Sequence, residues 1–336
     1  MTDGQSTSLI GSDRLFGLDE IESGFSMKNM ASLAESESRF RIFDLSDTGP
    51  NQFRVSVLGQ QRIFNTPQNV QVKIVNTRRD INCEDLSYDY AHFFSNYFRS
   101  TRSTSSWSAF IVSGSTSRYN TLRRIQEAIT KSSKAVATST SWWGLYSIQL
   151  GPPFIIKLDP MFNESMMAII NEPHTPRTEA QQILYNMLLD TFGTHYVTHV
   201  IVGAIAHIFT LLSDAYAKSS SFQETMSQVS RMGHYFFLSS YSTDYSHRIE
   251  QSITESFRKT SQSFVEYRPL VPQVPGKTEW QSWLSNALST PVVVNRTLAP
   301  LSNLFYRYPL VQAHLRRTIN YFLNHGRHPM LADLNR

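Results

Sequence analysis

The stretch from Phe192 to Ala204 joins a helical pattern to a strand pattern, and this junction constrains the fold more than any other part of the sequence. Before it, apolar residues such as Ile183 and Met187 recur at helical spacing. After it, residues 196–212 are rich in Val, Ile, Phe and Thr, which is typical of a strand. Gly193 lies between the two, and glycine readily adopts the left-handed conformation that ends helices. The sequence therefore predicts a helix, a tight turn and a long strand in direct succession.

This junction resembles the signature of the membrane-attack-complex/perforin (MACPF) family. The signature consists of an aromatic residue, Gly, Thr or Ser, His, an aromatic residue, six further residues, Gly and a small residue. Its places are filled here by Phe192, Gly193, Thr194, His195, Tyr196, Gly203 and Ala204. The last place is usually a second Gly. Residues 142–162 and 280–304 resemble the family's flanking segments in the same order, so the chain is identified as a member over roughly residues 85–325.

The resemblance implies an α+β fold in which two helical clusters flank a bent, twisted antiparallel sheet of four strands, as in MACPF and cholesterol-dependent-cytolysin domains. The alternation of apolar residues predicts the core strands near residues 107–117, 142–150, 196–212 and 264–268. It predicts two further strands at 53–64 and 70–75. Helical periodicity predicts helices at 85–99, 120–134, 278–288 and 309–324.

The chain divides into three predicted parts. Residues 1–50 mix Gly, Ser and Asp with short apolar pieces, which favours a loosely structured N-terminal lead. Residues 51–325 form the MACPF domain, and residues 326–336 form a C-terminal tail.

The resemblance also implies a function, which is ring-shaped oligomerisation on a lipid membrane with formation of a β-barrel pore. Each helical cluster would unfurl into a hairpin, and many subunits would pool their hairpins. Such hairpins must cooperate, because only a closed barrel pairs all strand hydrogen bonds within lipid. The expected partners are the lipid membrane and either further copies of the chain or related MACPF subunits.

Residues 240–258 partly suit such a change of state. Their even positions are all polar, whereas apolar residues spaced by four lie in one strand register and also along one side of a helix. The predicted membrane-inserting residues here are Tyr241, Tyr245, Ile249, Ile253 and Phe257, and in the other cluster, 118–140, they are Ile125 and Ile129. A plain amphipathic surface helix explains the same spacing.

The residues argue against an enzyme. His195 and His199 are four residues apart on a strand-like stretch, so they need not share a face. The chain has no His-Glu-x-x-His motif, phosphate-binding loop or Gly-x-Ser-x-Gly elbow. Cys83 is the one cysteine, so no disulfide framework or paired-cysteine site forms. We therefore predict no catalysis, cofactor or metal. A net charge of only +4 and the lack of a recognition motif predict no nucleic-acid partner.

A non-lytic MACPF module, acting in adhesion, development or signalling, is the alternative function. Two features favour it. Residues 265–272 stand where the family often carries a Gly-Gly pair, and residues 118–140 make a poor lipid-facing register. The family implies a secreted or membrane-associated protein, although no signal peptide is visible at Met1, which leaves a cytoplasmic location as the alternative.

Overall fold

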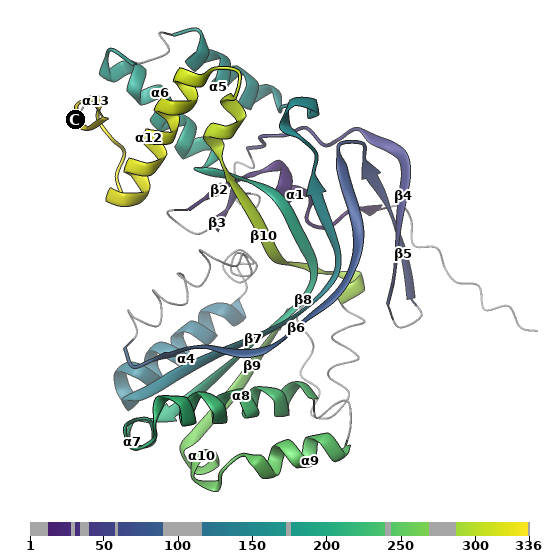
Figure 1. The fold of residues 1–336 in the computed structure, drawn as a ribbon, viewed down its shortest axis with the longest axis vertical. Coiled ribbons are helices and arrows are strands. Elements are labelled where there is room, and N and C mark those ends of the chain that lie inside the picture. The colour runs from purple at the N-terminus through teal and green to yellow at the C-terminus, as the bar shows by residue number, and fades with distance from the viewer. Residues whose placement is uncertain are drawn as a thin grey trace, which may run out of the picture.

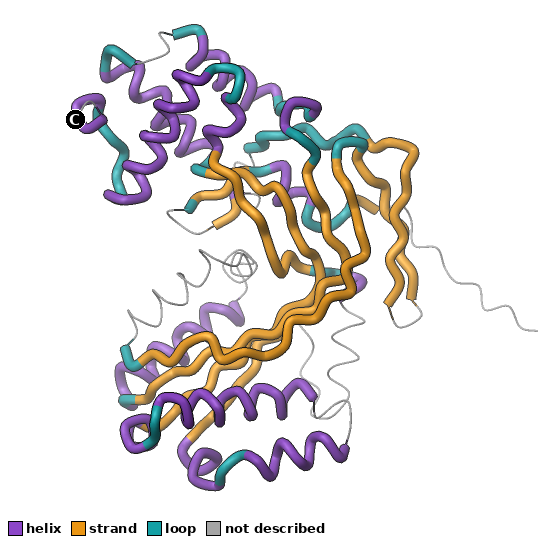
Figure 2. The backbone as a smooth tube through the Cα atoms, viewed as in Figure 1, coloured by secondary structure: helices purple, strands orange, loops and turns teal. Residues whose placement is uncertain are grey.

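A long antiparallel sheet organises the protein in the computed structural model (Figure 1). The structure describes residues 13–27, 31–33, 40–57, 60–89, 116–172, 176–238, 243–268 and 287–334. The central strands are β6 (Val70–Ser87), β7 (Lys134–Leu150) and β8 (His195–Ser213), with β7 between the other two. Figure 2 shows these strands curving together along their length. The predicted α+β class with an antiparallel sheet is confirmed.

Two separate strands occupy the other side of β8. β9 (Ser261–Arg268) pairs with residues 205–212, and β10 (Val292–Pro300) pairs with residues 195–203. The fourth position of the sheet is thus filled by two strands in succession. The strands predicted at 196–212 and 264–268 are confirmed, and β10 lies in the block expected to follow the last core strand.

The first two predicted core strands need correction. β7 begins at Lys134 rather than at 142, because small and β-branched residues from Ala135 onward pair with β8 and are buried. The strand predicted near 107–117 lies mostly outside the described residues, and its last two residues begin a helix. Its expected place beside β7 belongs to β6. β6 continues through Asp85–Ser87, where a helix was predicted, because Leu86 pairs with Ala137 and is buried there.

Helices gather at the two ends of this sheet (Figure 1). At one end lie α5 (Pro160–Ile170), α6 (Glu179–Phe192), α12 (Pro309–His325) and α13 (Leu331–Leu334), with the 3-10 turns η3 (Pro153–Ile155) and η4 (Leu301–Phe305). At the other end lie α4 (Thr116–Ser132), α7 (Asp214–Ser219), α8 (Phe222–Leu238), α9 (Thr243–Ser252) and α10 (Glu255–Thr260). Among the described helices, none is both long and apolar enough to cross a bilayer.

The described part of the predicted N-terminal lead packs into the core. Leu15, Leu18 and Ile21 are buried in the main apolar cluster, and α1 (Leu18–Glu22) contacts β8. β2 (Gly24–Ser26) pairs with β8, and β3 (Ala31–Ser32) pairs with β2. These pieces are too short to show a periodicity in the sequence, which is why the segment reads as loose. The predicted boundaries at residues 50 and 325 stay predictions.

A smaller sheet lies beside the central one. β4 (Thr48–Val57) and β5 (Gln60–Pro67) form a hairpin, and β1 (Asp13–Arg14) pairs in parallel with β5. Phe64 of this sheet is buried and its ring packs against Tyr146 of β7 at 5.9 Å between centroids. The aromatic contact joins the two sheets into one core.

A buried ion pair fastens the N-terminal segment to the sheet. Arg296 of β10 donates from Nε to Glu20 Oε2 at 3.0 Å, and its second terminal nitrogen lies 2.8 Å from Glu20 Oε1. The Arg296 side chain is 1% exposed and that of Glu20 is 10% exposed. Since both charges have left water, each depends on the other for compensation.

We predict that Arg296→Met lowers the free energy of unfolding by about 3–5 kcal/mol, because it leaves the Glu20 carboxylate buried without its cation. Glu20→Leu combined with Arg296→Met should cost much less than the sum of the two single changes. Urea unfolding of the three variants measures this coupling. Additive costs would show that the pair does not fasten α1 to β10.

Candidate functional site

The predicted signature forms the joint between α6 and β8. Gly193 follows the last residue of α6 with a φ of 80°, as the sequence predicts for a helix stop, and its N–H donates to Leu189 O. A Cβ on Gly193 would lie 2.7 Å from the carbonyl oxygen of Phe25. Both the dihedral angle and the lack of space therefore require glycine here.

Thr194 connects this joint to two other segments. Its N–H donates to Phe25 O at 3.0 Å, and its hydroxyl accepts from Met27 N at 3.1 Å, which fixes β2. Its carbonyl accepts from Leu301 N at 2.9 Å, which fixes the start of η4. Thr194 is almost fully buried. The small hydroxyl residue at this place of the signature thus serves as a structural connector.

The aromatic places of the signature belong to the core. Phe192 is fully buried and packs edge-on against Phe162 of α5, with ring centroids 5.0 Å apart. Tyr196 is buried and packs against Phe43 at 5.6 Å. These contacts join α5, α6 and β8, so the signature aromatics position the helices above the sheet.

The histidine of the signature is a half-buried group held neutral. His195 Nδ1 lies 2.9 Å from the Thr194 hydroxyl, and burial lowers the pKa of His195 to about 4. Burial also lowers the pKa of His199. Within the described ranges, no three His, Cys, Asp or Glu side chains gather in a way that holds a metal ion. The position of His195 therefore favours a structural role.

A glycine pair marks a register shift between β7 and β8. Gly203 of β8 pairs with Gly144 of β7, and the register of β7 shifts by one residue immediately after, between Gly144 and Tyr146. A Cβ on Gly203 would lie 1.9 Å from the carbonyl oxygen of Trp143. The two backbones approach this closely only without a side chain at 203. Ala204, at the next place of the signature, is fully buried, and the core has room for its methyl group.

The second helical cluster, α7–α10, packs on the sheet. One small core holds Leu86, Ala135, Ala137 and Leu212 of the strands together with Val229 of α8, Phe257 of α10 and Ile253 of the connection between α9 and α10. Ile249 of α9 packs at its margin. Three predicted membrane-inserting residues of this cluster, at 249, 253 and 257, therefore face the sheet. Tyr241 lies outside the described residues, and of Tyr245 only its place in α9 is described.

Polar contacts between α8, α9 and α10 supplement that small core. Thr254 N donates to Gln228 Oε1 at 3.1 Å, and Arg231 donates to Ser252 O at 2.6 Å. Arg258 forms an exposed ion pair with Glu250 at 3.5 Å. Exposed pairs of this kind contribute about 0–1 kcal/mol each, so the apolar contacts carry most of the attachment.

The first helical cluster is described only by α4. Ile125 and Ile129 are both buried, and α4 contacts β7. Figure 1 shows α4 on one side of the strands and α8 on the other. The helix predicted at 120–134 is confirmed, although it begins at Thr116, and residues 134–140 of the predicted cluster belong to β7 instead.

Sequence reasoning missed three parts of this site. Gly144 is the partner of Gly203, and its only signal is a glycine inside an otherwise bulky strand. Gly24 approaches the turn so closely that a Cβ there would lie 1.7 Å from Phe192 O. Arg296 looks like an ordinary charged residue in the sequence. Its neighbours in the chain do not indicate that its partner is the buried Glu20, 276 residues away.

Comparison with known proteins places this geometry in context. A family model described as the MAC/Perforin domain matches residues 15–332. No curated protein matches the sequence. The chain is similar to the crystal structure of GNIP1Aa from Chromobacterium piscinae, with a TM-score of 0.55 and 13% identity over 97% of this chain and 57% of that one. The present chain thus spans little more than half of that protein.

Two other solved structures show weaker similarity. Astrotactin-2, a vertebrate-specific, perforin-like membrane protein involved in neuronal development, has a TM-score of 0.42 and 12% identity over 90% of this chain and 97% of that one. A putative cell invasion protein with a MAC/Perforin domain from Bacteroides thetaiotaomicron has a TM-score of 0.43 and 14% identity over 94% of this chain and 63% of that one.

We predict that Gly203→Val lowers the free energy of unfolding by about 3 kcal/mol or more, because its side chain collides with the Trp143 carbonyl. Gly326→Ala is the matched control. It changes a glycine with a φ of 67° but open surroundings, so it carries about 1 kcal/mol of backbone strain and no collision. Chemical unfolding measures both. Equal losses would contradict the close approach of β7 and β8.

The lowered pKa of the half-buried His195 predicts a loss of stability in acid. The folded pKa of His195 is about 4, below its ordinary 6.5, so only the unfolded chain takes up this proton between those values. The free energy of unfolding contributed by neutral His195 is therefore fully present above pH 6.5. It is lost as the pH falls toward 4. Burial raises the pKa of Glu22, which acts in the opposite sense. We therefore expect His195→Asn to flatten the wild-type stability slope between pH 6.5 and 4.

The control for this experiment is His325→Asn, a change at an exposed histidine of α12. Unfolding midpoints measured across the pH range should show the wild-type slope for this variant. A wild-type slope in His195→Asn as well would mean that His195 is not held neutral in the folded protein.

Proposed function

The chain belongs to the MAC/perforin family, and from this premise we propose that it oligomerises on membranes and forms a β-barrel pore. The family match covers most of the chain and makes it a perforin-like protein. Proteins of this family are pore-forming or structural proteins and not enzymes. The finer choice between a pore-forming and a non-lytic protein rests on the arguments below.

One topological observation carries the proposal. α7–α10 connect β8 to β9, which are adjacent antiparallel strands paired up to Leu212 and Ser261 at this end of the sheet. In the same way, α4 leads into β7, which pairs with β6 up to Ser87. If either connection became extended, it would continue an existing hairpin in register. Residues 214–260 supply two strands of roughly twice the 9–11 residues that span a bilayer.

The side chains of the second cluster suit both states. In the folded domain, α9, α10 and the residues between them direct Ile249, Ile253 and Phe257 toward the sheet. In an extended strand the same three residues would share one face with Gln251 and Glu255. Glu250 and Ser252 would lie on the other face. The apolar residues would then exchange contact with the sheet for contact with lipid. Leaving the small core costs the apolar contacts between these residues and the sheet. Contact with lipid would offset that loss, and contact with water would not.

The proposed partners and location follow from this mechanism. The active form is a ring of this chain or of related MACPF subunits on a lipid membrane, because a single hairpin in lipid leaves its edges unpaired. We place the protein outside the cell or at a membrane, with a cytoplasmic location as the alternative. The chain spans 57% of GNIP1Aa, so the activity of a longer protein carrying this domain is part of the proposal.

A non-lytic role in adhesion, development or signalling is the second candidate, and one observation favours it. In α4, Ile125 and Ile129 alternate with Glu127 and Lys131 in strand register, and Glu127 forms ion pairs with Arg123 and Lys131. An extended form of this segment would direct those charges toward lipid at a cost of about 2–4 kcal/mol for each cation at the midplane. The first cluster thus suits a permanent helix better than the second does.

We predict that a disulfide between α8 and the sheet blocks lysis. Val229→Cys paired with Ala137→Cys, in a Cys83→Ser background, links two members of the same small core. The locked protein should release no dye from liposomes, and reduction should restore release, because the helices must leave the sheet. Rings seen by electron microscopy should form in both states, since the lock leaves the rest of the domain unchanged.

The two single-cysteine variants are the controls and should lyse with or without reductant. Lysis by the oxidised double variant, with the bond verified by mass spectrometry, would rule out unfurling of α7–α10. Absence of lysis and rings in every variant, on vesicles of several compositions, would make the non-lytic role the first choice.

A further inference from the structure

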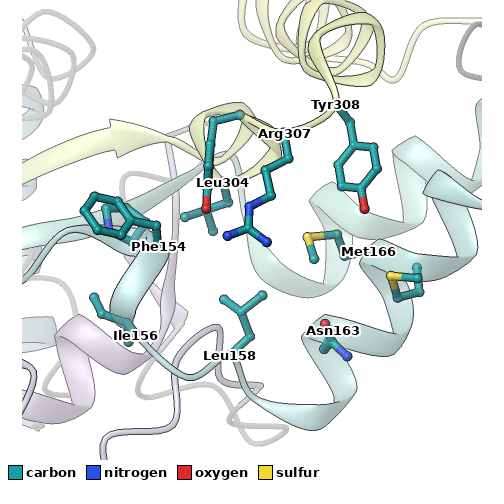
Figure 3. Close-up of a pocket in the computed structure, with 11 residues that line it drawn as sticks. Phe154, Ile156, Leu158, Asn163, Met166, Leu304, Arg307 and Tyr308 are labelled. Carbon is teal, nitrogen blue, oxygen red and sulfur yellow. The ribbon is translucent and has the colours of Figure 1, made fainter.

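The end of the sheet opposite the two helical clusters carries a cavity that the proposed function does not use. It measures about 310 Å³ and lies between two segments, residues 153–167 and 304–308. The first segment follows the end of β7 and the second follows the end of β10. Figure 3 shows side chains from η3, α5 and the end of η4 directed into one space.

The walls of the cavity combine polar and apolar surface in about equal parts. Its apolar lining comes from Phe154, Ile156, Leu158, Met166, Met167 and Leu304. The two methionines are flexible and polarisable, so this wall adapts to the shape of an occupant. A volume of about 310 Å³ is at the lower end of the range for small-molecule sites.

One cation enters this space from the part of the chain that the structure describes. In Figure 3, Arg307 extends between Phe154 and Tyr308 toward Leu158. Its guanidinium lies over the Tyr306 ring at 5.5 Å, and it forms no ion pair with another described residue. Among the described residues, no acidic side chain lines the cavity. The charge of Arg307 is therefore available to an occupant, with the side chains of Tyr308 and Asn163 as neutral hydrogen-bonding groups nearby.

Three large apolar or aromatic side chains that line the cavity are also exposed at the surface, namely Phe154, Met167 and Tyr306. Phe154 is 64% exposed. Exposed apolar residues gathered around a hollow mark interaction sites, whereas scattered ones do not. An occupant that extends beyond the cavity would cover them.

The backbone of the lining segments is already engaged. The N–H groups of Ile156, Asn163 and Tyr308 donate to Pro153, Asp159 and Phe305 within their own turns. Residues 157–159 pair with residues 42–44 through Asp44 N to Lys157 O and Asp159 N to Ile42 O. An extended peptide, which is recognised mainly through its backbone, finds few free partners here. Recognition of an occupant therefore rests on the guanidinium of Arg307 and on the apolar residues of the lining.

We propose that this cavity binds a single-chain amphipathic carboxylate, with the carboxylate on Arg307 and the acyl chain along Phe154, Leu158 and Met166. The planar guanidinium fork matches the two oxygens of one carboxylate. A phosphate group usually gathers several cations or backbone donors, whereas the described lining residues include one cation. The site lies at the end of the sheet away from α4 and α7–α10, so a membrane contacted by those clusters would not reach it.

Calorimetric titration with sodium dodecanoate below its micellar range tests the proposal. We expect saturable binding with one ligand per chain. Arg307→Gln should weaken it about tenfold or more, because a charge-assisted hydrogen bond is lost. Met167→Trp, a change at a half-exposed wall residue, should abolish binding by filling the cavity. Arg316→Gln, at an exposed arginine of α12 outside the cavity, is the matched control and should bind as the wild type does. Thermal melts establish that all three variants fold.

Parallel titrations separate the other occupants. Dodecanol and dodecyltrimethylammonium should bind at least tenfold more weakly than dodecanoate, since neither offers an anion to Arg307. Equal binding of either, or equal binding of dodecanoate to Arg307→Gln, would overturn the proposal. Tighter binding of dodecyl phosphate would replace the carboxylate by a phosphate, and Arg307-dependent binding to phosphatidylserine vesicles without dodecanoate binding would make the site a membrane contact. Because binding is measured in solution, the result is independent of whether the protein lyses membranes.

Discussion

The close contact between the backbones of β7 and β8 at Gly203 is the constraint on which the rest of the structure depends. Both strands run the full length of the sheet, and Gly203 and Gly144 face each other where the register shifts. Residues from both sides of this point belong to the larger apolar core, which also contains α5, α6 and α12, and a smaller core attaches α7–α10. A side chain at 203 would push apart the two strands that these cores share.

The signature residues act together as one joint and not as separate functional groups. Thr194 binds β2 and η4, Gly193 makes room for Phe25, and Phe192 and Tyr196 fill the core. Each of these roles needs a particular size or backbone freedom, which explains the chemical character of each place in the signature. The joint fixes the upper end of β8. The bend and the helical clusters are therefore positioned from a rigid end.

Sequence reasoning recovered the parts of the fold whose signals are local. The turn at Gly193, the long strand after it and the helix from Pro309 each carry their own periodicity or stop residue. It failed where structure comes from distant partners. α1 and β2 are short pieces held by β8 and Arg296, and β6 continues through Leu86 because β7 lies alongside. The spacing of Ile183 and Met187 predicts α6, but both side chains are exposed. The spacing therefore predicts the helix correctly and its buried face wrongly.

The split of the fourth sheet position into β9 and β10 gives the two halves of one sheet edge different local stabilities. β10 is tied to α1 through the buried Arg296 and continues into η4, which Thr194 holds. Among the described residues, β9 is held by its pairing with β8 and by its connection to α10. Because β9 and β10 pair with different residues of β8, the hydrogen bonds of β9 can open without disturbing those of β10. Proteins open in such cooperative units, each with its own free energy. An edge of this kind exposes a new pairing surface on the lower half of β8 while the upper half stays closed.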